Sequence, residues 1–581
     1  MAQHRPRPST RAALIVACAL LPACTSAKAM ELMSSASSTT TTQSLSDEAL
    51  PTRAVVTTTS TSPPTSTTTT SLPADTTTTA ALRDPYAQPG WVVAENAKPG
   101  TNDWRLPATV RSSEQDSPTG WIEGYADAAS VQYGHTLTLF VDTPAATFTV
   151  QAYRMGWYGG AQGRLVWTSA ATPGGRQLVA TYDRQIGMSE APWHSSLTVP
   201  VTPQWPPGQY LLKLVSDAGG SHYVPLTVRD DRAAGGLMVV SAVTTWQAYN
   251  PWGGCSLYAC SADRRHDRAQ VVSFNRPYSH QYHRGSADFL DHELPLVTLV
   301  EQLGIDTSYV TDLDLHSQPD LVNDRRGVIT LGHDEYYSTT MRDALESAVA
   351  RGVNLAFLGA NAVYRHIRMQ PDASGRPDRQ MVNYREQTDP GAVADSQQAT
   401  VQWRNAPLRR PEATLIGVQY GCAGVRAPMR LVNTANWVFA NTGAGNNQQI
   451  DNLVGVEFDE LAPRSFTPES LEVLAASPVR CRGLQYQHVM SYYSNAAGAG
   501  VFATGTINWI CAIDGSCASL EASSVVRGVT ANVLLEFAQG PAGRAHPSVA
   551  NSARYRTVLA PPTDTAAPEA PTTTAAEPTS P

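Results

Sequence analysis

Alternating apolar and polar residues dominate the chain from about residue 89 to residue 230. Turn residues separate short alternating segments at 136–141, 146–154, 178–182, 196–199, 210–215 and 223–228. This period of two residues predicts half-buried strands, and their regular spacing is typical of two packed antiparallel sheets. We therefore predict an immunoglobulin-like β-sandwich over residues 89–232.

Two segments of this region carry further information. Trp205-Pro206-Pro207-Gly208-Gln209-Tyr210 looks like the turn and tyrosine that open a late strand in such sandwiches, where the tyrosine hydroxyl bonds back to the corner. Arg154 to Gly160 collects aromatic and glycine residues on one connection. Packing at a corner and a ligand platform both explain that composition.

A different pattern begins after Gly235. Wholly apolar runs at 237–243 and 328–331 alternate with segments of helical period, which indicates a buried, mostly parallel sheet. The clearest unit has a helix at 296–303, strands at 307–310, 328–331 and 353–358, and a helix with the apolar face Met341, Leu345, Ala348 and Val349. With right-handed crossovers, this predicts a doubly wound α/β domain, flavodoxin-like or amidotransferase-like, over residues 233–542.

The two ends of the chain have no core-forming pattern. Arg5, Arg7 and Arg11 precede an apolar run at 12–21 that is too short to span a bilayer, and Leu21-Pro22-Ala23-Cys24 resembles the bacterial lipobox. This predicts a signal peptide at 1–24, a lipid on Cys24 that attaches the protein to the membrane, and export as a cell-surface lipoprotein. Ordinary cleavage, giving a secreted protein, is the alternative. The Thr-, Ser- and Pro-rich segments 25–88 and 543–581 predict a disordered linker and tail.

Beyond Cys24 the chain has an even number of cysteines, which in an oxidising compartment favours disulfides. Their spacing suggests the pairs Cys255–Cys260 and Cys511–Cys517, each around a short loop, with Cys422–Cys481 as the remainder. A metal–thiolate site is the alternative, although no C-x-x-C pair occurs.

Charge and missing motifs exclude several classes of function. A net charge of -8 without a long basic run argues against a nucleic-acid partner. The lysines end at Lys213, so the larger predicted domain has neither a phosphate-loop lysine for a nucleotide nor a Schiff-base lysine for pyridoxal phosphate. The G-x-S-x-G and H-E-x-x-H motifs are also absent from the sequence.

Polar residues follow the predicted strands, where open α/β sheets bind ligands. His333, Asp334, Glu335 and Tyr336 stand together at a strand-to-helix turn and are the candidate catalytic residues. The alternative is that Asp334 or Ser338 caps the next helix while His333 and Tyr336 fill space. Residues of three other segments are expected to orient a substrate: Tyr249, Asn250, Arg276 and Asn361.

Glu457 and Asp459 lie on the same side of a later strand-like stretch. They are either part of the site or residues of an exposed sheet edge.

Several motifs in order resemble the N,N-dimethylformamidase large-subunit family, C-terminal domain, over about 235–510. They are Thr245-Trp246-Gln247-Ala248-Tyr249-Asn250, Ser273-Phe274-Asn275-Arg276-Pro277-Tyr278, Asp312-Leu313-Asp314-Leu315, Gly332-His333-Asp334-Glu335-Tyr336 and Leu358-Gly359-Ala360-Asn361. Arg154 to Gly160 resembles the module that precedes this domain in exported members.

The resemblance implies hydrolysis of a small amide by a mononuclear iron that two tyrosines and a glutamate hold. Tyr336 matches one tyrosine, whereas Glu293 to Val297, where the second would fall, has none, and Gln397 to Thr400 has no carboxylate. Ferric iron favours phenolate and carboxylate oxygen, so a rearranged iron site could use Tyr336, Glu335, His333 and Glu457.

Two hypotheses of function follow. The first is an exported hydrolase of a C–N bond, with a small-molecule amide as substrate and His333 or Glu335 as general base. The second is a catalytically inactive surface protein, in which the aromatic loops at 246–252 and 154–158 hold a glycan or cell-wall polymer.

Overall fold

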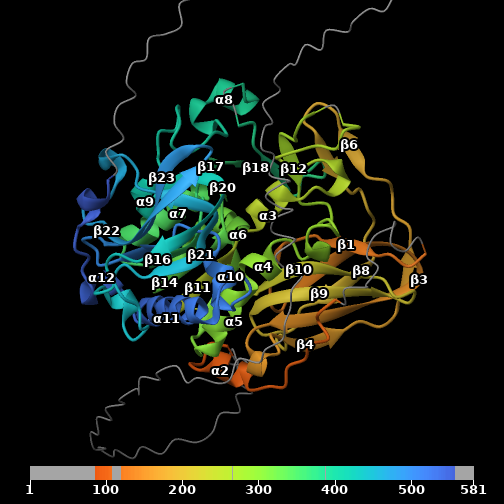
Figure 1. The fold of residues 1–581 in the computed structure, drawn as a ribbon. Helices are drawn as coiled ribbons and strands as arrows, with labels where there is room; N and C mark the ends of the chain where they lie inside the picture. Colours follow the sequence, from red (N-terminus) through yellow and green to blue (C-terminus); the bar gives the residue numbers. More distant parts are fainter. Residues whose placement is uncertain (1–85, 107–118, 234, 265, 386–387, 557–581) are drawn as a thin grey trace, which may run out of the picture.

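The computed structural model describes residues 86–106, 119–233, 235–264, 266–385 and 388–556 (Figure 1). The predicted signal peptide, Cys24 and nearly all of the predicted linker lie outside the described residues. The last part of the predicted tail, from residue 557, also lies outside them. In these ranges no helix is long and apolar enough to cross a membrane.

Residues 123–229 build an eight-stranded sheet around one long strand, β3 (Thr136–Met155). The first half of β3 pairs with β1 and β8, and its second half pairs with β4, β5 and β9. The remaining bounds are β1 (Glu123–Ala126), β2 (Ser130–Gln132), β4 (Gly163–Thr168), β5 (Thr172–Gly175), β8 (Leu197–Pro200), β9 (Gly208–Ser216) and β10 (Ser221–Arg229). A separate hairpin comprises β6 (Thr181–Asp183) and β7 (Met188–Glu190).

Strands are present at the predicted positions except at 178–182, where only β6 begins at Thr181, and the immunoglobulin-like sandwich is wrong as a description. Two separate sheets were expected, whereas β3 runs through both halves of one continuous sheet. The sequence predicted two short strands where the structure has one strand of 20 residues. The alternation is interrupted at Thr143 and its neighbours, but the strand does not end there. The hydrogen bond expected of Tyr210 is confirmed, since its hydroxyl donates to the Pro206 carbonyl at 2.8 Å.

A seven-stranded sheet forms the centre of the second half of the chain, in the order β13-β11-β14-β16-β24-β23-β22. The pairings from β13 to β24 are parallel, and β23 and β22 add antiparallel strands at one edge. The bounds are β11 (Leu237–Ser241), β13 (Thr307–Thr311), β14 (Gly327–His333), β16 (Asn354–Ala360), β22 (Glu472–Cys481), β23 (Leu484–Ser494) and β24 (Gly500–Ala503).

Apolar residues cover both faces of this sheet. Leu237 and Val239 join one core cluster, whereas Met238 and Val240 join another, because successive side chains of β11 point to opposite faces.

The helices of the described residues have the following bounds: α2 (Trp91–Asn96), α3 (Val243–Tyr249), α4 (Phe289–His292), α5 (Leu294–Gln302), α6 (Asp312–Ser317), α7 (Thr339–Ala350), α8 (Pro390–Ala394), α9 (Ala413–Ile416), α10 (Trp509–Ile513), α11 (Leu520–Phe537) and α12 (Ala542–Ala545).

The predicted class, a doubly wound flavodoxin-like or amidotransferase-like α/β domain, is wrong. Strand residues outnumber helical residues and are spread over several sheets, and β12 (Val271–Ser273), β18 (Arg368–Gln370) and β19 (Gln380–Val382) form a small sheet outside the central one. The prediction extended the helix–strand alternation of 296–358 over the whole region. Between β16 and β24 that alternation stops: β20 (Gln419–Arg430) and β21 (Gln449–Glu460) form a long hairpin, and the helices there have at most five residues.

A buried ion pair joins the two halves of the molecule. Arg154 of β3 donates to both carboxylate oxygens of Glu301 on α5, at 2.5 Å and 2.8 Å, and neither side chain is exposed. The Tyr158 hydroxyl accepts from the same guanidinium at 2.9 Å. The segment 154–158 is therefore largely interior, which fits packing at a corner and not an aromatic ligand platform.

The described residues contain three disulfides, and all three match the predicted pairs: Cys255–Cys260, Cys422–Cys481 and Cys511–Cys517. The first closes a short loop just before β12, and the second joins β20 to β22.

Candidate functional site

The end of β14 carries the segment that the sequence singles out. His333 is the last residue of β14, and Tyr336 begins the short strand β15 (Tyr336–Tyr337), which pairs with β17 (Arg365–His366). Helix α3 fastens this turn from the side, because the Glu335 backbone N–H donates to the Thr245 hydroxyl at 2.9 Å. Gly332 precedes the turn with a φ of +44°, where a Cβ would approach the His292 carbonyl oxygen to 2.7 Å.

Two tyrosines bond one carboxylate and a third tyrosine bonds one of them, and we name Tyr249, Tyr258, Glu335 and Tyr336 the tyrosine–glutamate cluster. The hydroxyls of Tyr249 and Tyr258 donate to Glu335 Oε2 at 3.0 Å and 2.5 Å. The Tyr336 hydroxyl donates to the Tyr258 hydroxyl at 2.8 Å. Glu335 and Tyr336 are buried, while Tyr249 and Tyr258 are partly exposed, so the cluster has a buried floor and an accessible rim.

Two arginines, Arg365 and Arg385, flank the cluster, and we name them the guanidinium pair. Arg365 Nε donates to Glu335 Oε1 at 3.1 Å, and Arg385 Nη2 donates to the Tyr336 hydroxyl at 2.8 Å. Burial disfavours the charged form of Glu335, but His333 and Arg365 outweigh it and lower the pKa of Glu335 to about 2. Glu335 is thus a fixed negative charge and a poor proton acceptor at neutral pH.

His333 and Glu457 form the titrating part of the site. His333 Nε2 lies 3.6 Å from Glu335 Oε2 and 3.9 Å from Glu457 Oε2. Although burial disfavours the imidazolium, these carboxylates raise the pKa of His333 to about 9. Burial raises the pKa of Glu457 to about 6, against the opposing effect of His333. An imidazolium beside a carboxylate that titrates near neutral pH is suited to proton transfer.

Glu457 and Asn361 present unused oxygens to this region. Glu457 lies on β21, its side chain is 15% exposed, and its Oε2 has no hydrogen-bond partner within the described ranges. The same holds for Asn361 Oδ1, next to the end of β16. Asp459 is buried and accepts from the Asn361 backbone N–H at 2.9 Å. Glu457 and Asp459 are therefore not on an exposed sheet edge.

Asp334 lies apart from the cluster. It accepts a hydrogen bond from the Tyr337 hydroxyl at 2.5 Å, and burial raises its pKa above the usual range for aspartate. Helix α7 is capped by Ser338, whose side chain accepts from the Met341 backbone N–H. Capping thus accounts for Ser338, while Asp334 makes a separate buried contact.

Asn250 and Arg276, two of the residues expected to orient a substrate, form hydrogen bonds with neighbouring loops. Asn250 donates to Gln247 Oε1 and the Pro277 carbonyl, and its Oδ1 accepts from the backbone N–H groups of Trp252 and Ser279. Arg276 donates to Gln247 and to the carbonyls of Trp252, Cys255 and Asn250. The polar atoms of both side chains are occupied by the protein itself.

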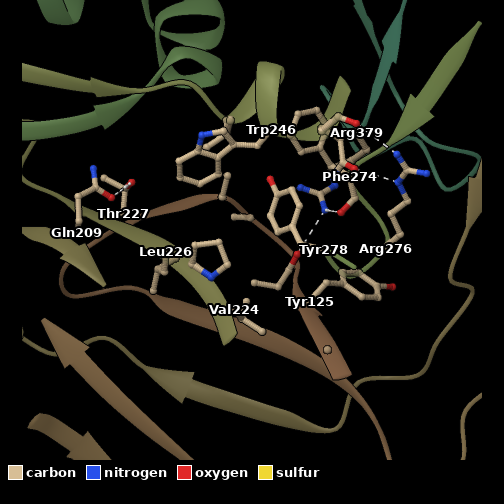
Figure 2. A pocket seen from close by; sticks show the side chains of 17 residues that line it. Tyr125, Gln209, Val224, Leu226, Thr227, Trp246, Phe274, Arg276, Tyr278 and Arg379 are labelled. Atoms are coloured by element: carbon tan, nitrogen blue, oxygen red, sulfur yellow. Dashed lines mark hydrogen bonds between the residues drawn. The ribbon is translucent and has the colours of Figure 1, made fainter. Parts of the chain in front are cut away.

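Arg276 also lines a small cavity between the two halves of the molecule (Figure 2). Trp246 and Tyr278 lie on one side of it, and Val224 and Leu226 of β10 lie on the other. Its volume of about 40 Å³ is enough for a few water molecules. None of the lining residues belongs to the tyrosine–glutamate cluster, so this cavity is separate from the candidate site.

Sequence reasoning missed Tyr258, Arg365 and Arg385. Tyr258 lies inside the loop that the Cys255–Cys260 disulfide closes, and this placement in a tethered loop is a signal that could have been used. The two arginines carry no local signal, because their partners are 30 and 49 residues away in the chain.

The iron that the sequence resemblance implies can be compared with these donors. Two tyrosines and a glutamate are indeed together, as Tyr258, Tyr336 and Glu335, but Arg385 already occupies the Tyr336 oxygen and Arg365 the second Glu335 oxygen. A metal cation at these donors would lie beside two positively charged guanidinium groups. Each pair of unit positive charges about 4 Å apart repels by roughly 4 kcal/mol near a protein surface. Within the described chain no cluster of three His, Cys, Asp or Glu side chains suits a metal. The donors do not fit iron, and the iron site stays a prediction.

Comparison of the chain with known proteins identifies its family. No curated protein matches the chain. A Paenibacillus sp. cycloisomaltooligosaccharide glucanotransferase complexed with cycloisomaltoheptaose is 9% identical over 66% of this chain and 68% of that chain, and its TM-score of 0.13 supports no argument. The family model described as N,N-dimethylformamidase beta subunit-like, C-terminal, matches residues 149–521, which include every residue of the candidate site. Since this match covers more than half of the chain, the protein belongs to the N,N-dimethylformamidase beta subunit-like, C-terminal family.

Proposed function

We propose that the protein hydrolyses a C–N (amide) bond, with Glu457 as the general base. The observation that carries this proposal is the Glu457 carboxylate: it is partly exposed, has an oxygen without a hydrogen-bond partner in the described chain, and lies 3.9 Å from His333. A general base needs a pKa near the working pH, and the pKa of Glu457 is raised to about 6 while its side chain is 15% exposed.

In the proposed reaction, a water molecule transfers a proton to Glu457 as its oxygen attacks the amide carbonyl carbon. The tetrahedral intermediate carries its negative charge on the former carbonyl oxygen, where the His333 imidazolium and the partly exposed Arg365 offer positive charge. Glu457 then returns the proton to the nitrogen as the C–N bond breaks. The immediate products are a carboxylic acid and a neutral amine, which exchange a proton in water to give a carboxylate and an ammonium ion, and the enzyme ends in its starting state.

Glu335 and the tyrosines have a positioning role in this scheme. The low pKa of Glu335 keeps it ionised, so it holds His333 protonated and orients the hydroxyls of Tyr249 and Tyr258. The scheme uses residues of this chain alone.

The test is release of an amine from a panel of small amides. We expect Glu457→Gln to lower kcat by about 10² to 10⁴, which is the usual contribution of general base catalysis. Glu460→Gln is the matched control, because Glu460 lies on the same strand but outside the cluster. Equal turnover by Glu457→Gln and the unsubstituted protein would refute the assignment.

The alternative of an inactive glycan-binding protein gains no support from the aromatic loops. Trp246 is 3% exposed, and the Trp252 indole N–H donates to Glu123 at 3.1 Å. Glycan platforms need exposed aromatic faces, whereas Trp246 is buried and Trp252 is partly buried and held by this hydrogen bond.

A further inference from the structure

The guanidinium pair brings two positive charges to one carboxylate. Arg365 contacts Glu335, whereas Arg385 forms no ion pair with a carboxylate in the described part of the chain. His333 adds a third cationic group near Glu335, and Glu457 supplies the second carboxylate. Arg385 thus lacks a carboxylate partner in the described part of the chain, and a negatively charged ligand would supply one.

A vacant donor marks where such a ligand would bind. Arg385 Nε is buried, and no hydrogen-bond acceptor meets it among the residues that the structure describes. A buried N–H of a charged group without an acceptor is costly, so native proteins rarely retain one without a ligand or water to satisfy it. Arg385 Nη2 is already used on Tyr336, which fixes the plane of the guanidinium.

Aromatic rings hold both guanidinium groups in place. Arg385 lies over the Tyr258 ring, 4.1 Å from its centroid, and Arg365 lies 5.0 Å from the centroid of Tyr364. Such stacking orients a planar fork before any ligand arrives, and a prepositioned arginine fork matches the two oxygens of a carboxylate.

We propose that the site takes amides that carry a carboxylate near the scissile bond, and that Arg385 binds this carboxylate. N-acyl amino acids and the C-terminal ends of peptides belong to this class. The inference rests on the proposed amide hydrolysis for the identity of the scissile bond, whereas carboxylate binding by Arg385 can be measured without turnover.

The experiment compares matched ligands that differ only in charge. N-acetyl amino acids and the corresponding N-acetyl amino acid amides are titrated into the protein by calorimetry, with Glu457→Gln as the background so that nothing is hydrolysed. We expect the carboxylates to bind at least about tenfold more tightly than the amides, as charge-assisted bidentate pairs do.

Substitution then assigns the preference to Arg385. Arg385→Gln should reduce the ratio of affinities to about one, and Arg385→Lys should retain part of it, because lysine keeps the charge but not the planar fork. Arg480→Gln, on the exposed face of β22, is the matched control and should leave the ratio unchanged. An unfolding curve for each variant shows whether the fold is retained. The lysine variant, which keeps the positive charge, shows whether a lower ratio reflects loss of the contact.

Two results would overturn the inference: no binding of any carboxylate at millimolar concentration, or a preference that survives Arg385→Gln. Failure of the proposed hydrolysis looks different. In that case the unsubstituted protein would bind the carboxylates with the expected preference and release no amine from any of them.

Discussion

Removing the charge of Glu301 tests the account of how the two halves of the molecule are held together. Its carboxylate accepts hydrogen bonds from Arg154, from the Tyr309 hydroxyl at 2.8 Å and from Asn96 Nδ2 at 2.8 Å. In Glu301→Gln, one oxygen becomes an NH₂ group that faces donors, and the buried Arg154 loses its counter-charge. Breaking one partner of a buried ion pair costs about 3–5 kcal/mol, and we expect a loss of stability in this range.

The assay is urea unfolding followed by tryptophan fluorescence, with the free energy of unfolding extrapolated to water. Glu536→Gln is the control: Glu536 is partly exposed and pairs with His546 at 3.4 Å, so its loss should cost less than about 1 kcal/mol. The double variant Arg154→Met with Glu301→Leu removes both charges and should be more stable than Glu301→Gln alone. A cost below about 1 kcal/mol for Glu301→Gln would refute the reasoning.

Three further predictions concern pH and covalent links. Because the pKa of Glu457 is raised to about 6, amide hydrolysis should decline as pH falls through that value, and a profile of kcat/KM that is flat from neutral pH to well below it would contradict this. The pKa of His333 is raised to about 9, so its contribution to stability, at most about 3 kcal/mol, is complete below its ordinary value and is lost as pH rises through the folded-state pKa. His333→Gln should remove this dependence from unfolding curves measured across the alkaline range. Replacing Cys422–Cys481 by serines should cost about 4 kcal/mol and replacing Cys255–Cys260 about 2 kcal/mol, because the sequence separations are 59 and 5. Calorimetric unfolding that gives the reverse order would disagree with the loop-entropy argument.

Local patterns in the sequence predict individual elements well. The apolar run at 328–331 lies inside β14, and the helical face that begins at Met341 lies on α7, because burial of one face imposes a period on each element. The disulfide pairs also followed from spacing, since short loops restrict which cysteines can meet.

The class of the fold and part of the site depend on contacts that no local pattern records. The long hairpin of β20 and β21 interrupts the helix–strand alternation that the segment 296–358 suggested would continue. Arg385 becomes a site residue because a loop brings it over the Tyr258 ring, whose own position depends on a disulfide. His333, Glu335 and Tyr336 could be selected because they are close in sequence, whereas Tyr258, Arg365 and Arg385 could not.

The candidate site draws on segments from Tyr249 to Glu457, and this separation has a consequence for the order of folding. No fragment that ends before β21 contains Glu457, so a chain emerging from the ribosome cannot assemble the site until most of the second sheet has been synthesised. Contacts between such distant residues also form late, because the entropy of closing long loops must be met first. During refolding, ligand binding should therefore return after secondary structure. A nascent chain that does not yet include Glu457 should have no complete site.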